Sequence, residues 1–231
     1  MSLNVKDIKT ESKFERPPSL DAGTYPGAPV QVIGLGLQEQ RAWKGETKSP
    51  RQMLKITYEL ADEFMLDEEG KEDESRPRWV SEDFPLHSLE ADLATSTKRY
   101  NAMDPTLEHG GDFSKLLGSP CLIVLSADPS KKDADVIYNN VKDVNAMRAK
   151  DAAKAAGLVN PTKVFDFYKP DFEVFQSLPE WIQNTIKEGL DYEGSTLEGL
   201  VNGGGGAEKK PAEEKENNGA SEESGSDGDD W

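Results

Sequence analysis

The chain of 231 residues has one cysteine, two histidines and no long apolar run. Since Cys121 has no partner in the chain, an intrachain disulfide is impossible, which agrees with a reducing compartment. No run approaches the roughly 18 apolar residues of a membrane-spanning helix. The first residues carry charges and lack the apolar core of a signal peptide. We therefore expect a soluble cytoplasmic protein that contacts no membrane.

Motifs for nucleotide, metal or catalytic chemistry are missing as well. Gly34 and Gly36 begin a GxG pattern, but the third glycine of a dinucleotide site is absent. His87 and His109 have no Cys or His at the spacing of zinc ligands. The acidic run 67–74 lacks the alternation of a calcium loop. We expect no catalytic residues, no metal and no cofactor.

The composition divides the chain into a folded part and a tail. Hydrophobic residues make up 35% and charged residues 31%, with a net charge of -17. From Gly203 onward there is no large apolar residue until Trp231, so residues 203–231 are expected to form a disordered acidic tail. Nine acidic and three basic residues give 207–231 a charge of -6, which leaves -11 for the remainder.

Alternation along 51–60 gives the clearest strand. The residues expected in the core are Gln52, Leu54, Ile56, Tyr58 and Leu60. The residues expected on the exposed face are Arg51, Met53, Lys55, Thr57 and Glu59. An earlier strand begins near Thr24, and its glycines at 34 and 36 indicate a bulge. Residues 38–50 are expected to form a polar loop, and residues 67–76 an acidic one.

Three further strands and a helix follow. The third strand begins near Arg78 and is expected to point Val80, Phe84 and Leu86 inward and Trp79, Ser81 and Asp83 outward. A helical period over 88–103 places Leu89, Leu93, Thr97 and Tyr100 on one side, and Asp104-Pro105 ends it. Strands are expected over 120–127, with Cys121 in the core, and over 136–144.

This β-β-β-α-β-β order is that of an OB-fold. We expect a mostly β fold with helical additions: an N-terminal arm (1–22), a five-stranded OB-fold-like barrel that binds single-stranded DNA (23–148), and a helical appendage (149–202). Within the appendage we expect a helix over 149–156, a short strand over 164–168 and a helix over 171–189. The appendage could pack on the barrel or on a second subunit, as in a homodimer.

Basic and aromatic residues on strands two and three and in the adjoining loops suit single-stranded DNA, which needs cations for phosphates and aromatic faces for bases. The candidate DNA-binding residues are Arg41, Trp43, Lys44, Lys48, Arg51, Lys55, Arg76, Arg78, Trp79, Lys131 and Lys132. Trp43 and Trp79 could instead fill the space between barrel and appendage. For Lys98, Arg99 and Tyr100, a solvated helix face with Tyr100 in the core is favoured.

The chain resembles bacteriophage single-stranded DNA-binding proteins that combine an OB-fold with an acidic tail. The resemblance covers about residues 20–148 and the tail. It is carried by the strand pattern 24–63, the stretch from Arg78-Trp79 to Arg99-Tyr100, Leu117-Gly118-Ser119-Pro120, Tyr138-Asn139-Asn140-Val141 and Asp229-Asp230-Trp231. Many relatives end in Phe where this chain ends in Trp, and residues 149–200 have no counterpart.

The resemblance implies a protein that coats single strands during replication and recombination. Its tail would recruit replication or recombination proteins through Asp227, Asp229, Asp230 and Trp231. A terminal indole among carboxylates suits a pocket with a basic rim. The charge of the core favours an alternative, an acidic interaction protein or DNA mimic that binds no DNA.

Overall fold

A computed structural model describes residues 17–43, 45–133 and 135–203, and only the backbone of Arg41 and Trp43. The strands are β1 (Gly23–Trp43), β2 (Glu46–Leu66), β3 (Glu72–Pro85), β4 (Cys121–Pro129), β5 (Ile137–Ala146) and β6 (Lys163–Phe165). The helices are α1 (Thr95–Met103), the 3-10 helix Phe113–Leu116, α2 (Ala149–Ala152), α3 (Phe172–Gln176), α4 (Glu180–Lys187) and α5 (Thr196–Asn202). The mostly β fold with helical additions is confirmed.

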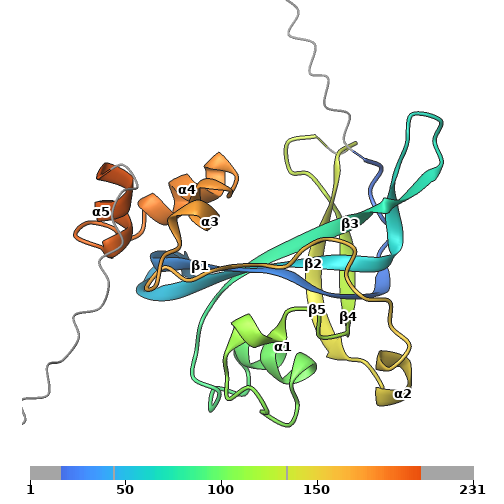
Figure 1. Cartoon of the computed structure of the whole chain (residues 1–231), viewed down its shortest axis with the longest axis horizontal. Coiled ribbons are helices and arrows are strands. Elements are labelled where there is room, and N and C mark those ends of the chain that lie inside the picture. The colour runs from blue at the N-terminus through green and yellow to red at the C-terminus, as the bar shows by residue number, and fades with distance from the viewer. Residues whose placement is uncertain (1–16, 44, 134, 204–231) are drawn as a thin grey trace, which may run out of the picture.

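The strands form one sheet in the order β3-β2-β1-β4-β5, with antiparallel neighbours, and β6 joins β1 in parallel. Figure 1 shows α1 on one side of this sheet and α3 to α5 at the far end of the β1–β2 hairpin. The sheet is open: no hydrogen-bonded pairing joins β3 to β5 within the described residues. The sheet therefore does not close into the barrel that the sequence predicts.

The β1–β2 hairpin is longer than the sequence predicts. The expected polar loop 38–50 is instead paired strand, with Gln38 opposite Arg51 and Trp43 opposite Glu46. The turn is tight, and Gly45 has a φ of +85° that favours glycine. Polarity misleads here because a two-stranded ribbon that projects beyond the core needs no apolar face.

The predicted bulge is present in β1, where the register shifts between Gly34 and Gly36. Gly36 has a φ of +76°, and a Cβ there would lie 2.7 Å from Asp191 Oδ1. That carboxylate accepts a hydrogen bond from the backbone N–H of Leu37 at 2.9 Å. The bulge therefore lets the segment before α5 bind the backbone of β1.

The inner face of the sheet holds the main core, as the alternation predicts. Leu54, Ile56, Tyr58 and Leu60 are buried there, together with Val80 and Phe84 of β3 and with Cys121, Ile123, Leu125 and Val144. Leu20 of the predicted N-terminal arm also belongs to this core, and its backbone N–H donates to Asn139 Oδ1 at 2.8 Å. Residues 1–16 of the arm lie outside the described part of the chain.

The outer face of β2 contradicts the prediction. Lys55, Thr57 and Glu59 are only 7%, 5% and 3% exposed. The predicted appendage covers this region of the sheet, and β6 pairs with Gln31–Ile33 of β1. A second core forms beneath it from Ile33, Leu35, Phe165, Phe167, Phe175, Leu178, Ile182, Ile186 and Leu197. The appendage was expected to pack either on the barrel or on a second subunit. In the structure it packs on the sheet of its own chain.

Helix α1 begins at Thr95, later than the expected 88. The preceding residues form turns that contact the first turn of α1: Ser96 Oγ accepts from the backbone N–H of His87 at 3.1 Å, and Thr97 donates to the Ser88 carbonyl at 3.2 Å. Leu93 lies in this turn region and is 87% exposed, so its expected place on the buried helix side is wrong. Tyr100 is buried and Asp104 ends the helix, as predicted.

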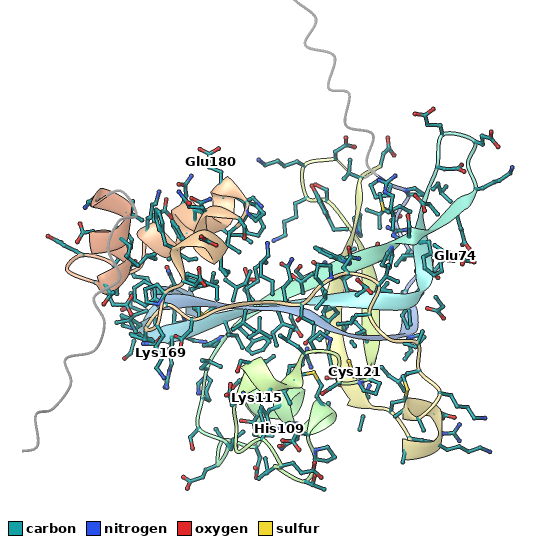
Figure 2. All side chains as sticks on the ribbon, viewed as in Figure 1. Glu74, His109, Lys115, Cys121, Lys169 and Glu180 are labelled. Carbon is teal, nitrogen blue, oxygen red and sulfur yellow. The ribbon has the colours of Figure 1, made fainter. Side chains whose placement is uncertain are left out.

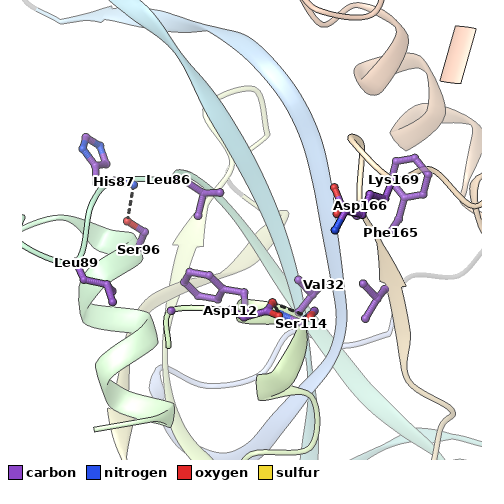
Figure 3. A pocket seen from close by; sticks show the side chains of 13 residues that line it. Val32, Leu86, His87, Leu89, Ser96, Asp112, Ser114, Phe165, Asp166 and Lys169 are labelled. Atoms are coloured by element: carbon purple, nitrogen blue, oxygen red, sulfur yellow. Dashed lines mark hydrogen bonds between the residues drawn. The ribbon is translucent and has the colours of Figure 1, made fainter. Parts of the chain in front are cut away.

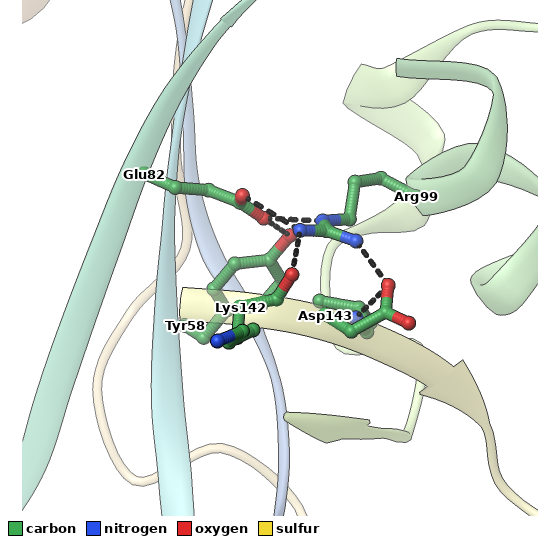
Figure 4. A network of polar contacts seen from close by, with 6 residues as sticks. Tyr58, Glu82, Arg99, Lys142 and Asp143 are labelled. Carbon is green, nitrogen blue, oxygen red and sulfur yellow. Dashed lines mark hydrogen bonds and ion pairs between the residues drawn. The ribbon is translucent and has the colours of Figure 1, made fainter. Parts of the chain in front are cut away.

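Arg99 of α1 bridges the two ends of the open sheet (Figure 4). It is 4% exposed, donates to Glu82 of β3 at 2.8 and 3.1 Å, and donates to Asp143 of β5 at 2.5 Å. It also donates to the carbonyl of Lys142 at 3.2 Å. Burial alone would lower the pKa of Arg99, but the bonds and charges of Glu82 and Asp143 keep that pKa above its usual value. Arg99 is thus a structural residue, and the expected solvated helix face is wrong for it.

Replacing Arg99 by Ala should lower the free energy of unfolding by about 3–5 kcal/mol, because Glu82, whose side chain is 11% exposed, loses its charge partner and keeps the hydrogen bond from Tyr58 Oη at 2.9 Å. Urea unfolding followed by circular dichroism measures this. Lys98→Ala, at the exposed neighbouring position, is the matched control and should change stability by less than about 0.5 kcal/mol. Equal stability of the two variants would contradict the bridging role.

Burial raises the pKa of the Cys121 thiol to about 12. The native protein should therefore react with iodoacetamide at about pH 8 far more slowly than the protein in urea, because the thiolate is the nucleophile. Since the folded pKa lies above the unfolded one, this group stabilises the fold below about pH 8.5, and the contribution falls as the pH rises toward 12. Labelling of the native protein at the unfolded rate would show that Cys121 is accessible.

Candidate nucleic-acid interface

The outer face of β3 carries the exposed aromatic residue that the sequence predicts. Trp79 is 44% exposed, and Ser81 and Asp83 beside it on the same face are exposed too. The indole Nε1 of Trp79 donates to Glu59 Oε2 at 3.1 Å, which fixes one edge of the ring against β2. The exposed part of the indole is available to a stacking partner.

Glu59 joins this face to the C-terminal segment. Besides Trp79, its carboxylate accepts bonds from the backbone N–H of Val159 at 2.6 Å and of Asn160 at 3.3 Å, and from Asn160 Nδ2 at 2.7 Å. A buried carboxylate is tolerated only when such donors replace water. Glu59 therefore explains both the position of Trp79 and the way the segment after α2 is fixed on the sheet.

Lys55 was expected to be an exposed phosphate ligand, and that expectation is wrong. Its ammonium lies 2.7 Å from Asp83 Oδ1 and 4.8 Å from the centroid of the Trp181 ring. With its side chain 8% exposed, Lys55 is held by a carboxylate and an aromatic face and lies beneath the C-terminal segment. A phosphate in solvent has no access to it in this arrangement.

Trp181 is a candidate residue that the sequence analysis did not single out within the helix expected over 171–189. In α4, Ile182 and Ile186 are buried, whereas Trp181 is 57% exposed. The sequence contains a signal for this exposure. Positions 182 and 186 are four residues apart and share one helix face, and position 181 lies about 100° around the helix from that face. The cation–π contact with Lys55 then holds the indole at the β2–β3 surface.

The two exposed indoles flank a floor of polar side chains, of which Ser81 and Asp83 of β3 are exposed, whereas Lys55, Thr57 and Glu59 of β2 are buried. Trp79 lies opposite Glu59 and Asp83 lies opposite Lys55, with Ser81 and Thr57 between them. The hydroxyls of Thr57 and Ser81 are 3.0 Å apart. Positions 79 and 83 are about 13 Å apart along the strand. Trp79 therefore stands at one end of this floor, and Trp181, through Lys55, at the other.

A groove of about 830 Å³ runs beside this floor. Its lining comes from the β1–β2 hairpin, β3 and β5: Glu39, Gln40, Ala42, Lys48, Met53, Ser81, Glu82, Asp83, Pro85, Asn140 and Val141. Two of its carboxylates are already engaged, since Glu82 binds Arg99 and Asp83 binds Lys55. The negative charge that the groove presents to a ligand is therefore smaller than the number of its acidic residues suggests.

The other predicted basic residues fall into separate groups. Lys48 and Arg51 are exposed in the first half of β2, toward the turn of the β1–β2 hairpin. Arg76 and Arg78 lie in β3, and the exposed Lys131 and Lys132 lie between β4 and β5. Lys44 and the side chains of Arg41 and Trp43 lie outside the described residues, as do Asp227, Asp229, Asp230 and Trp231. The structure does not gather the described cations into one patch.

A second cavity, of about 510 Å³, lies between the turns around α1 and the end of β6 (Figure 3). Its polar groups are used locally: Ser96 holds His87, Asp112 accepts from Ser114 N at 2.9 Å, and Asp166 accepts from Tyr168 N at 2.9 Å. In the described part of the chain no group of His, Cys, Asp and Glu could hold a metal ion. The face of β3 is the better candidate site.

Comparison of the chain with family models, curated proteins and solved structures found no match. Within residues 17–43, 45–133 and 135–203, no helix has the length and apolar character needed to cross a membrane.

Glu59→Ala should release the segment after α2, because three donors of Val159 and Asn160 lose their acceptor. Without this acceptor the segment opens more readily, so the backbone amides of Val159 and Asn160 should exchange hydrogen faster. Mass spectrometry of peptides covering 157–162 measures this. Glu74→Ala, at an exposed position in the β2–β3 hairpin (Figure 2), is the control. Unchanged exchange in Glu59→Ala would refute this role.

Proposed function

We propose that the protein binds single-stranded DNA across the outer face of β3, where Trp79 and Trp181 stack on bases. The observation that carries this proposal is the pair of indoles, 44% and 57% exposed, held at opposite ends of one polar floor. Large exposed aromatics fixed by buried partners are costly to leave in water and are a common means of binding unpaired bases. A floor of about 13 Å suits a strand of a few extended nucleotides.

We further propose that the sheet is an opened OB-fold. The strand order β3-β2-β1-β4-β5 leaves β3 and β5 at the two ends, where residues of the two strands approach one another and Arg99 bridges them. Helix α1 lies between β3 and β4 in the chain, which is the OB-fold arrangement. In that fold the outer face of strands two and three is the usual nucleic-acid surface, which agrees with the position of Trp79.

Phosphates would be bound by the cations on either side of the floor. Lys48 and Arg51 are exposed and border one end, and the exposed Arg76 and the half-buried Arg78 continue β3 beyond Trp79. Lys131 and Lys132 are candidates from the β4–β5 connection. Because the protein has a net charge of -17, binding should depend more on stacking than in basic proteins, and the extent to which salt weakens it should follow the number of phosphates that these cations contact.

An acidic interaction protein that binds no DNA is the second candidate. It is favoured by the burial of Lys55 and by the separation of the remaining basic residues into groups. The acidic tail, with Asp227, Asp229, Asp230 and Trp231, suits either function. Recruitment of replication or recombination proteins by the tail, and a homodimer, remain predictions.

Trp79→Ala and Trp181→Ala should each weaken binding of oligo-dT by about 1–3 kcal/mol, or roughly 5- to 150-fold, because a stacking face is lost. Anisotropy of a labelled oligonucleotide at low and moderate salt measures this. Trp79→Phe and Trp181→Phe are matched controls, which keep an aromatic ring and should retain most of the affinity.

Two outcomes would contradict the proposal in different ways. Wild-type affinity in both alanine variants would remove the assignment of the face and leave DNA binding intact. Absence of binding by the unaltered protein at low salt would remove DNA binding itself and favour the acidic interaction protein.

A further inference from the structure

A further groove, of about 590 Å³, lies beside α2. It is distinct from the groove along β3 and from the cavity near α1. Its floor is apolar and comes from three strands and the start of the C-terminal segment: Pro26, Ala61, Leu122 and Met147, closed by Ala155 and Ala156. None of these residues lines the groove along β3. An apolar floor open to solvent is typical of a surface that binds a partner.

The rim of this groove is basic in an otherwise acidic protein. Arg148 and Lys154 line it, and Lys150 is exposed in the same stretch. Asp151 is the one acid of 148–156, and it pairs with Arg148 at 2.5 Å. The stretch therefore has a net charge of +2, whereas residues 1–206 together carry -11. A ligand for this groove should be apolar at its centre and acidic around it.

We propose that this groove binds the C-terminal residues of the chain, with the indole of Trp231 on the apolar floor and Asp229 and Asp230 at the basic rim. Trp231 is the only large apolar residue after Val201, and it follows two carboxylates directly. The indole can bury about 150–250 Å² of surface. The terminal carboxylate adds another charge for Arg148 or Lys154 to bind.

The chain is long enough for this contact. The segment after Gly203, residues 204–231, has 28 residues, so it spans at most about 90–100 Å when extended. A flexible segment of that length has an end-to-end distance of about 26–32 Å. A domain of this size has a radius of gyration of about 16 Å. Although Figure 1 shows α5 and α2 at opposite ends of the molecule, the terminus can reach the groove of its own chain or of a second copy.

Photocrosslinking of the full chain tests the proposal without DNA, so its result is independent of the proposed function. p-Benzoylphenylalanine replaces Trp231, and mass spectrometry maps the cross-links after irradiation. We expect them to concentrate in 147–156, with Met147 as the main site, because it lies on the floor. The same residue placed at Ser224 is the positional control and should give no such concentration.

Lys154→Glu should reduce the cross-link yield about fivefold, the factor that corresponds to a loss of about 1 kcal/mol for an exposed ion pair. Lys115→Glu makes the same charge change at an exposed residue in the 3-10 helix and should leave the yield unchanged. Cross-links within one chain or between two chains both support the proposal, and a denaturing gel separates the two.

Cross-links to the face around Trp79 and Ser81, or cross-links without a preferred site, would overturn the proposal. A second measurement keeps the natural terminus. Hydrogen exchange of 147–156 should be faster in Trp231→Ser than in the unaltered protein, because the groove loses its cover. Equal exchange in the two proteins would overturn the proposal even if the photoreactive residue disturbs docking.

Discussion

Two buried charges on the outer face of β2 help to hold the segment after α2 and helix α4 on the sheet. Removal of a carboxylate or an ammonium from water costs several kcal/mol, so Glu59 and Lys55 must be compensated. Glu59 is compensated by amides of the segment after α2 and by the Trp79 indole. Lys55 is compensated by Asp83 and by the Trp181 ring. The same contacts that satisfy these charges fix both exposed indoles.

The inner face of the sheet could be predicted because its signal is local. Leu54, Ile56, Tyr58 and Leu60 alternate with polar residues, and only one face of a strand can enter an apolar core. The outer face could not be predicted in the same way. Glu59 and Asn160 are 101 residues apart, and nothing in the sequence around β2 indicates that another segment covers it.

The candidate site was therefore only partly predictable. Trp79 was found because exposure follows from strand parity and from the arginines beside it. Alternation places Lys55 on the outer face of the sheet as well. It is nevertheless buried, because α4 covers it. To predict that Trp181 is exposed, one must first decide which residues of the helix face the core. Because tryptophan is apolar, its type alone suggests burial. Contacts with buried partners fix both indoles, a hydrogen bond to Glu59 for Trp79 and a cation–π contact with Lys55 for Trp181. Such contacts are a tertiary property that strand and helix patterns do not contain.

The open sheet has a consequence for association between copies of the chain. Because β3 and β5 do not pair, each presents backbone groups to which a foreign strand could add. Along β3, Pro77 and Pro85 lack the N–H that such pairing requires, and Glu72, Asp73 and Glu74 would repel another acidic strand. Where β3 faces β5, Arg99 occupies the gap with its side chain. The protein thus leaves its sheet unclosed, while the prolines and acids of β3 make that edge a poor template for a foreign strand.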